Sequence, residues 1–208
     1  MRAQTRHRTN VAVYEGRPVS DEAAYWAGFL LADGWVRRKC PTIHLNLAVK
    51  DVAHIEAFRD FIMPTGEVKS THGGRCAVLR VYGVVRLLPL LERFGIVERK
   101  SHGHPMPDLD EAEFWPFVRG FFDGDGHIGH HSSYWHIVFA GRGDFLSWLH
   151  LEIKSRLDVG GSLCATKKRS HRLAFCSAQA RLLAAHLRGS PSLGRKQQTI
   201  IQATGETA

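Results

Sequence analysis

The stretch FVRGFFDGDGHIG, residues 117–129, decides how this chain folds, because an altered copy of it occurs earlier in the sequence. It ends an apolar run with two aspartates two positions apart among four glycines, and both the close carboxylates and the glycines are unfavourable within a helix. The stretch YWAGFLLADGWV, residues 25–36, aligns with residues 117–128 and places Asp33 opposite Asp125, 92 positions later. Two related stretches of this length predict an internal repeat.

The repeat extends beyond these two stretches. The same order of segments follows each of them, and the offset between matching residues grows slowly, as short loop insertions would make it grow. Three more pairs of matching residues lie 93, 95 and 96 positions apart: Asp51 with Asp144, Gly66 with Gly161, and Lys100 with Lys196. The sequence therefore predicts a tandem duplication.

Hydrophobic periodicity predicts the elements within each copy. Residues 41–50 alternate strictly, with Ile43, Leu45 and Leu47 on one side and polar residues on the other, which is typical of a half-buried strand. The segments 51–61 and 144–157 carry apolar residues at helical spacing and predict amphipathic helices. Each copy is expected to run helix, strand, strand, helix, strand, strand, helix. The predicted fold class is α+β, with tandem pseudo-symmetric αββαββα repeats.

The expected organisation has five parts. A basic N-terminal extension (1–20) precedes the first repeat (21–98), and a linker rich in proline, histidine and charge (99–111) leads to the second repeat (112–200). A short C-terminal tail (201–208) follows. The linker composition is typical of a surface connection between two packed units.

Composition narrows the class of function. The net charge of +8 favours a polyanionic partner such as nucleic acid. No apolar stretch approaches the length of a membrane span, and no apolar run follows the basic N-terminus, so we expect an intracellular protein with no membrane partner. The four cysteines lie far apart and form no Cys-x-x-Cys pair, which disfavours a zinc knuckle or a disulfide framework.

Small residues recur four positions apart in both opening helices, as Gly28 and Ala32 in one and Gly120 and Gly124 in the other. Such stripes let two helix backbones approach closely. We therefore expect the two helices to pack against each other at a central seam between the copies. The aspartates that end the two helices would then lie together.

Two carboxylates at helix C-termini need a physical explanation. The helix dipole disfavours an acid there, and adjacent acids repel each other. A divalent cation would remove both penalties, and oxygen-rich sites with water ligands suit magnesium. An ordinary turn would explain one such acid, but not two at matching positions. A calcium loop starting at Asp123 is excluded, because its sixth and twelfth positions would be Ile128 and Tyr134.

The segments WAGFLLADG (26–34) and VRGFFDGDG (118–126) resemble the paired motifs of the LAGLIDADG homing endonucleases. The resemblance covers residues 21–200 and implies a monomer in which two curved antiparallel sheets form a DNA-binding saddle, with the two motif helices at the central seam. It also implies site-specific cleavage of both DNA strands across the minor groove of a long, partly asymmetric target. The implied cofactor is Mg²⁺, for which Mn²⁺ or Ca²⁺ can substitute in binding.

The resemblance also implies a metal site. The penultimate acid of each motif is the metal ligand in this family, which makes Asp33 and Asp125 the candidate catalytic residues and metal ligands. The backbone carbonyls of Ala32 and Gly124 complete the implied set of protein ligands.

Basic residues that follow the third helix of each repeat commonly assist catalysis in this family, and Lys100 and Lys196 lie at that position. A lysine can polarise the attacking water or neutralise charge that develops on the phosphorane. The two motifs differ at their sixth position, which is Leu31 in the first copy and Asp123 in the second. That position is not the metal ligand, and we expect Asp123 to be a hydrogen-bonding residue at the helix end.

DNA reading is expected to fall to the polar strand faces, because the major groove accepts β-ribbons and is read by arginine, lysine and asparagine. The candidates in the first copy are Arg37, Arg38, His44, Asn46, Lys69, Arg75 and Arg80. The candidates in the second copy are His130, His131, His136, Arg142, Lys167, Lys168, Arg169 and Arg172.

Two alternatives remain open at this point. Five histidines near the linker and the second motif could indicate a zinc or histidine-metal nuclease, although no cysteine or asparagine partner lies at a diagnostic spacing: His102, His104, His127, His130 and His131. The alternative function is a DNA-binding regulator or an RNA maturase that keeps the fold without cleavage. The presence of both motif acids argues against that alternative.

Overall fold

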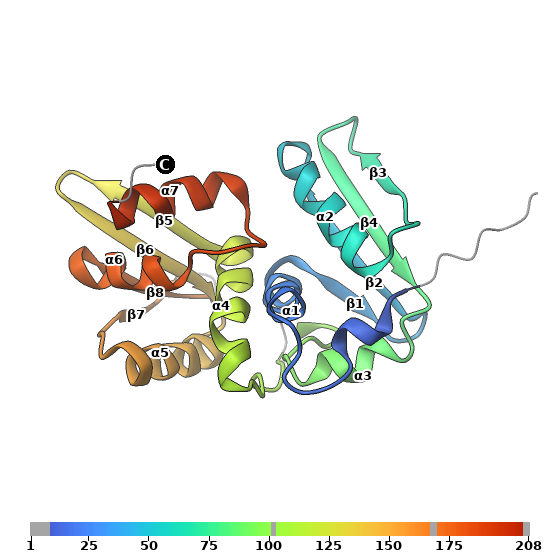
Figure 1. Ribbon diagram of the computed structural model, residues 1–208, viewed down its shortest axis with the longest axis horizontal. Helices are drawn as coiled ribbons and strands as arrows, with labels where there is room; N and C mark the ends of the chain where they lie inside the picture. Colours follow the sequence, from blue (N-terminus) through green and yellow to red (C-terminus); the bar gives the residue numbers. More distant parts are fainter. Residues whose placement is uncertain (1–8, 101–102, 167–169, 206–208) are drawn as a thin grey trace, which may run out of the picture.

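The computed structural model describes residues 9–100, 103–166 and 170–205, which form two repeats lying side by side (Figure 1). The first repeat runs α1 (Asp21–Asp33), β1 (Trp35–Arg37), β2 (Thr42–Ala48), α2 (Val52–Ile62), β3 (Val68–Thr71), β4 (Cys76–Tyr82) and α3 (Leu87–Glu92). Short 3-10 helices precede α1 and α2, at Val11–Tyr14 and Val49–Asp51.

The second repeat has the same order of elements. It runs α4 (Glu111–Asp125), β5 (Gly126–His131), β6 (Tyr134–Gly141), α5 (Gly143–Leu157), β7 (Ser162–Ala165), β8 (His171–Cys176) and α6 (Ser177–His186). The predicted α+β class and the αββαββα repeat are confirmed. A further helix, α7 (Gly194–Thr204), was not predicted and crosses the expected boundary at residue 200.

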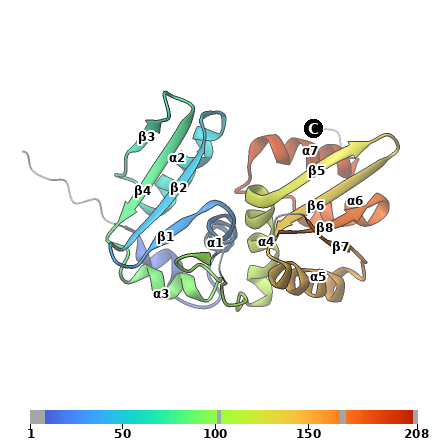
Figure 2. The ribbon, with the colours of Figure 1, turned by 180° about the vertical axis from the view of Figure 1, so that it is seen from behind.

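The two sheets share one topology. The strand order is β1-β2-β4-β3 in the first sheet and β5-β6-β8-β7 in the second, and all neighbours are antiparallel. Ile43, Leu45 and Leu79 point to the inner face of the first sheet and are fully buried, as are Ile55 and Phe58 of α2. Helices α2, α6 and α7 lie in front of the strands in Figure 1, and Figure 2 shows the strands from the opposite side. Each sheet therefore has one helix-covered face and one outer face.

Helices α1 and α4 form the predicted seam between the repeats (Figure 2). A Cβ built on Gly28 would lie 1.9 Å from the carbonyl oxygen of Phe117, and one built on Gly120 would lie 1.9 Å from that of Tyr25. These distances are far below van der Waals contact, so only glycine fits at either position. The predicted packing of the small-residue stripes is confirmed. Among the described helices, none is long and apolar enough to cross a membrane.

Candidate functional site

The seam brings the two motif acids together. Asp33 is the last residue of α1 and Asp125 the last residue of α4, and each is followed by an extended glycine, Gly34 before β1 and Gly126 as the first residue of β5. A Cβ built on Gly124 would lie 3.4 Å from Oδ2 of Asp33. Both acids therefore stand at the same edge of the seam, next to β1 and β5.

The electrostatics of this pair disfavour two free carboxylates. Partial burial, followed by the charge of Asp33, raises the pKa of Asp125 above its usual range. Partial burial also raises the pKa of Asp33, against the opposing charges of Lys100 and Lys196. Within the described residues, neither carboxylate takes part in a hydrogen bond or an ion pair. Two close, acceptor-only groups of this kind favour a bound cation.

Lys100 closes the C-terminal end of α1. Its Nζ donates hydrogen bonds to the carbonyl oxygens of Leu30 (2.9 Å), Leu31 and Ala32 (2.7 Å). The last carbonyls of a helix have no partner within the helix, and a cation there also suits the helix dipole. The predicted catalytic lysine is therefore also the cap of the motif helix.

Lys196, near the start of α7, does the same for α4. Its Nζ donates to the carbonyl oxygens of Phe122 (2.7 Å), Asp123 (2.7 Å) and Gly126 (2.6 Å). Lys196 is buried, with 7% of its surface exposed. Each ammonium thus uses its three N–H groups on backbone carbonyls at the C-terminal end of one motif helix.

Burial lowers the pKa of both lysines to about 8. At Lys100, the negative charge that most raises the pKa against the effect of burial is that of Asp125, from the other repeat. At Lys196 the carboxylate that most opposes the fall in pKa is Asp123 of α4, followed by Asp33 of the first repeat and then by Asp125. The positive charges therefore act on the motif acids across the seam, although neither ammonium bonds directly to a carboxylate.

The two backbone carbonyls expected to complete a metal site are unequal. The carbonyl of Ala32 already accepts a hydrogen bond from Lys100. The carbonyl of Gly124 is not among the three that accept hydrogen bonds from Lys196. A carbonyl oxygen has two lone pairs, so both can still face a cation. Oxygen donors from two carboxylates and two carbonyls fit a hard divalent ion whose remaining positions are filled by water or substrate.

A histidine-based metal centre finds no support in the parts of the chain that the structure describes. In those ranges no three His, Cys, Asp or Glu side chains are grouped so that they could hold a metal ion. His102 of the expected alternative lies outside the described residues. His104 lies instead beside Phe145, with 5.6 Å between the ring centroids, in the wall of a cavity of about 200 Å³ next to Asp125.

Strand register places most of the first copy's DNA-reading candidates on one face. Arg37 pairs with Thr42, and Arg80 pairs with His44, so their side chains share the outer face with Asn46 and with Lys69 of β3. These positions alternate with the buried residues of β2 and β4. The outer face of the first sheet is therefore basic and polar, as predicted.

Two other candidates of the first copy lie elsewhere. Arg38 lies directly after the end of β1, outside the strand, and makes an ion pair with Glu92 of α3. Arg75 lies in the turn between β3 and β4, where its Nε donates to the carbonyl oxygen of His72. The structure thus separates Arg38 from the group with which sequence reasoning placed it.

The outer face also carries aromatic residues that the sequence analysis missed. Trp35 is 43% exposed, its ring centroid lies 4.6 Å from that of His44, and the guanidinium of Arg37 lies 4.9 Å from its ring. Tyr82 is 54% exposed on the same face. Trp35 follows the motif acid by two positions, and the alternation that starts there would have identified it.

In the second copy, His131, His136 and Arg172 lie on the outer face of the sheet. His127, which the candidate set omitted, shares this face, with 5.4 Å between its ring centroid and that of His136. His130 pairs with Trp135 and has the same strand parity as the buried Ile128, so its assignment to the DNA-reading face is wrong. The error arises because a strand alternates its side chains and consecutive histidines cannot share a face.

Four candidates of the second copy remain to be placed. Arg142 immediately precedes α5 and makes an ion pair with Asp144. The other three lie outside the described residues: Lys167, Lys168 and Arg169.

The comparisons with known proteins concern the fold. No protein-family model matches the sequence, and no curated protein matches it. The crystal structure of the I-SmaMI LAGLIDADG homing endonuclease bound to cleaved DNA is similar with a TM-score of 0.64 and 12% sequence identity, covering 88% of this chain and 87% of that one.

Two further solved structures give the same result. The I-LtrWI LAGLIDADG homing endonuclease bound to target DNA is similar with a TM-score of 0.61 and 11% identity, over 89% of both chains. The LAGLIDADG meganuclease I-AabMI bound to uncleaved DNA is similar with a TM-score of 0.59 and 13% identity, over 90% of both chains. At such low identity the likeness shows the fold alone, and this chain has the fold of the LAGLIDADG homing endonucleases.

Proposed function

We propose that this protein is a site-specific double-strand DNA endonuclease that depends on divalent cations. The observation that carries the proposal is the position of Asp33 and Asp125 together at one edge of the seam, each beside the first strand of a sheet with a polar outer face. The structural neighbours I-SmaMI, I-LtrWI and I-AabMI were solved with DNA, which supports DNA as the partner of this chain.

The proposed metal ligands are Asp33 and Asp125, with the carbonyls of Ala32 and Gly124. Mg²⁺ is the proposed ion, with Mn²⁺ or Ca²⁺ as substitutes in binding. When bound, such an ion activates water and stabilises the leaving oxygen of a phosphodiester. The protein's own contribution is to hold two carboxylates close together against their repulsion, which the packing of α1 on α4 achieves.

Lys100 and Lys196 have two tasks in this proposal. Their ammonium groups fix the last turns of the motif helices, and with them the position of each acid. They also keep positive charge beside the seam, where negative charge develops on the phosphorane. One acid and one capping lysine at the end of each motif helix suit a substrate whose two strands are related by a local dyad.

The proposed DNA-binding surface is the saddle made by the outer faces of the two sheets. A β-sheet face can enter the major groove and read base edges there, while basic side chains neutralise phosphates. The faces differ, since the first carries Arg37, Lys69 and Arg80 and the second carries mainly histidines and Arg172 among its described residues. We therefore propose a long, partly asymmetric target bound by a single chain.

The substitutions Asp33→Asn and Asp125→Asn test this function. Each keeps the size of the side chain and removes a charged metal ligand, so DNA affinity should be retained while cleavage is lost. A target is first selected by binding from a random DNA library, and cleavage is then measured with Mg²⁺. Cutting by either variant at the wild-type rate would refute the assignment of the acids. Binding by the wild type without cutting would support the regulator or maturase alternative instead.

A further inference from the structure

Asp123, the acid that has no counterpart in the first motif, is buried at the end of α4. Only 2% of its surface is exposed. Its Oδ2 accepts a hydrogen bond from the backbone N–H of Leu193 at 2.7 Å and another from the hydroxyl of Tyr25 at 2.8 Å. The expectation of a hydrogen-bonding residue at the helix end is confirmed, but both partners are distant in sequence.

Together with hydrogen bonds of Lys196, these bonds join the end of α4 to the start of α7 in a ring of contacts. Leu193 immediately precedes α7, and its carbonyl accepts hydrogen bonds from the backbone N–H groups of Lys196 (2.8 Å) and Gln197 (3.1 Å). The Nζ of Lys196 then returns to the backbone carbonyl of Asp123 at 2.7 Å. The side chain of Asp123 thus fixes the start of α7, and its main chain receives the ammonium that α7 carries.

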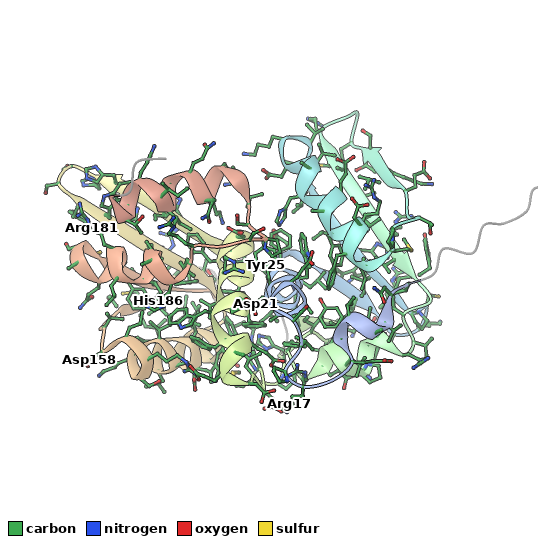
Figure 3. All side chains as sticks on the ribbon, viewed as in Figure 1. Arg17, Asp21, Tyr25, Asp158, Arg181 and His186 are labelled. Carbon is green, nitrogen blue, oxygen red and sulfur yellow. The ribbon has the colours of Figure 1, made fainter. Side chains whose placement is uncertain are left out.

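The segment before α7 is held by the same helix. Arg119, one turn before Asp123, donates from its guanidinium to the carbonyl oxygens of Arg188, Ser190 and Pro191. Tyr25, which lies at the seam in Figure 3, also shares a hydrogen bond of 2.9 Å with Nε2 of His54. Asp123 is therefore the point where α4, α7 and the other repeat meet.

Among the residues that the structure describes, no corresponding set of hydrogen bonds is found in the first repeat. Its matching position is Leu31, whose side chain cannot accept a hydrogen bond, and Lys100 reaches the end of α1 through carbonyl contacts alone. The two lysines therefore occupy similar places but are positioned by different means.

We propose that Asp123 is a positioning residue that holds Lys196, and not Lys100, in place for DNA cleavage. This rests on the proposed nuclease function. Asp123 does not touch the reacting atoms in this proposal, since it is buried and its Oδ2 accepts hydrogen bonds from Leu193 and Tyr25. It acts through the start of α7, which sets where the ammonium of Lys196 lies. Its loss should therefore affect the cleavage steps that need Lys196 and leave DNA binding intact.

Two substitutions separate geometry from charge. Asp123→Ala leaves the N–H of Leu193 unbonded, and the single-turnover cleavage rate should fall roughly 100-fold, as small misplacements of catalytic groups do. Asp123→Asn keeps an oxygen that can accept from Leu193, and it should restore the rate to within roughly tenfold of wild type. Equal losses in both variants would overturn the proposal, because the charge and not the position would then matter.

A double-mutant cycle tests the specificity for Lys196. Asp123→Ala should cost little further activity in a Lys196→Met background, because the group it positions is already absent. In a Lys100→Met background it should cost the full factor. Equal costs in the two backgrounds would refute a route through Lys196. Tyr25→Phe is the matched control, since it removes the other bond to the same carboxylate and leaves the bond to Leu193.

A readout that needs no cleavage keeps this proposal distinct from the nuclease function. Amide hydrogen exchange at Leu193, Lys196 and Gln197 should quicken in Asp123→Ala and return toward wild type in Asp123→Asn, while the amides of α1 stay unchanged. Unaltered exchange at these three amides in Asp123→Ala would overturn the proposal even in an active enzyme. The expected exchange pattern in a protein that cuts no DNA would refute the nuclease function alone.

Discussion

Gly28 of α1 and Gly120 of α4 each face the backbone of the opposite helix, and a Cβ on either would lie 1.9 Å from a carbonyl oxygen there. This reciprocal contact is the tightest feature of the seam and precedes each motif acid by five residues. It makes the seam the part of the fold least tolerant of added volume.

Gly120→Ala is accordingly expected to lower the free energy of unfolding by at least about 3 kcal/mol, because a methyl group must displace backbone. Urea unfolding followed by circular dichroism measures this loss. Gly194→Ala is the control, since a Cβ at Gly194 meets nothing within 4 Å and the first turn of a helix tolerates alanine. An unchanged unfolding midpoint for Gly120→Ala would show that the two helices can separate at little cost.

The cleavage rate should fall both at low pH and at high pH. The raised pKa values of Asp33 and Asp125 move the acid limit above the ordinary carboxyl range, because a protonated carboxyl group is a poor metal ligand. The rate should also fall as the pH rises through about 8, where Lys100 and Lys196 lose their charge. Single-turnover rates, with DNA affinity measured at each pH, test this profile. A rate that stays level from about pH 7 to 9.5 would show that the lysine charges do not contribute.

Stability should respond to pH through Asp123. Burial raises the pKa of Asp123 to about 6, so the folded chain keeps a proton that the unfolded chain releases near 3.8. The folded state therefore loses stability as the pH rises from about 3.8 to about 6. Asp123→Asn removes this loss, and its stability relative to wild type should increase across that window by up to about 3 kcal/mol. Unfolding free energies that stay parallel between pH 4 and 7 would contradict this prediction.

The first sheet should contribute fixed positive charge to DNA binding. Arg80→Ala is expected to weaken binding to all DNA sequences and to reduce the dependence of log K on log salt by about 0.9 for one lost phosphate contact. Arg181→Ala is the matched control, because Arg181 is exposed on α6, which covers the inner face of the second sheet (Figure 3). Equal salt dependences for the two variants would mean that the outer face does not meet the DNA backbone.

The sequence predicted the features that depend on local patterns, and it did not predict contacts between residues that lie far apart in the chain. The repeat aligned Asp33 with Asp125, and the small-residue stripes predicted that their helices touch, because these patterns are local. The partners of Asp123 could not be predicted, since Leu193 lies 70 residues later and Tyr25 98 residues earlier. The ion pair between Arg38 and Glu92 was missed for the same reason.

Other errors came from details of register. His130 and His131 were both assigned to the DNA-reading face, whereas strand alternation sends them to opposite faces. Lys100 and Lys196 were assigned from the resemblance alone. Nothing in the residues near them showed that their ammonium groups would cap the motif helices, because those helix ends lie about 70 residues away.

The contact at Gly28 and Gly120 has a geometric consequence for the whole molecule. Five residues of helix separate each glycine from its acid, or about 7.5 Å along the axis, so the contact acts as a pivot close to the acids and far from the sheet edges. A change of 5° in the crossing of the helices would move each acid by only about 0.7 Å. The outer faces of the sheets can therefore vary in sequence without altering the separation of the two carboxylates, so under the proposed nuclease function the DNA target can change while the cleavage chemistry stays the same.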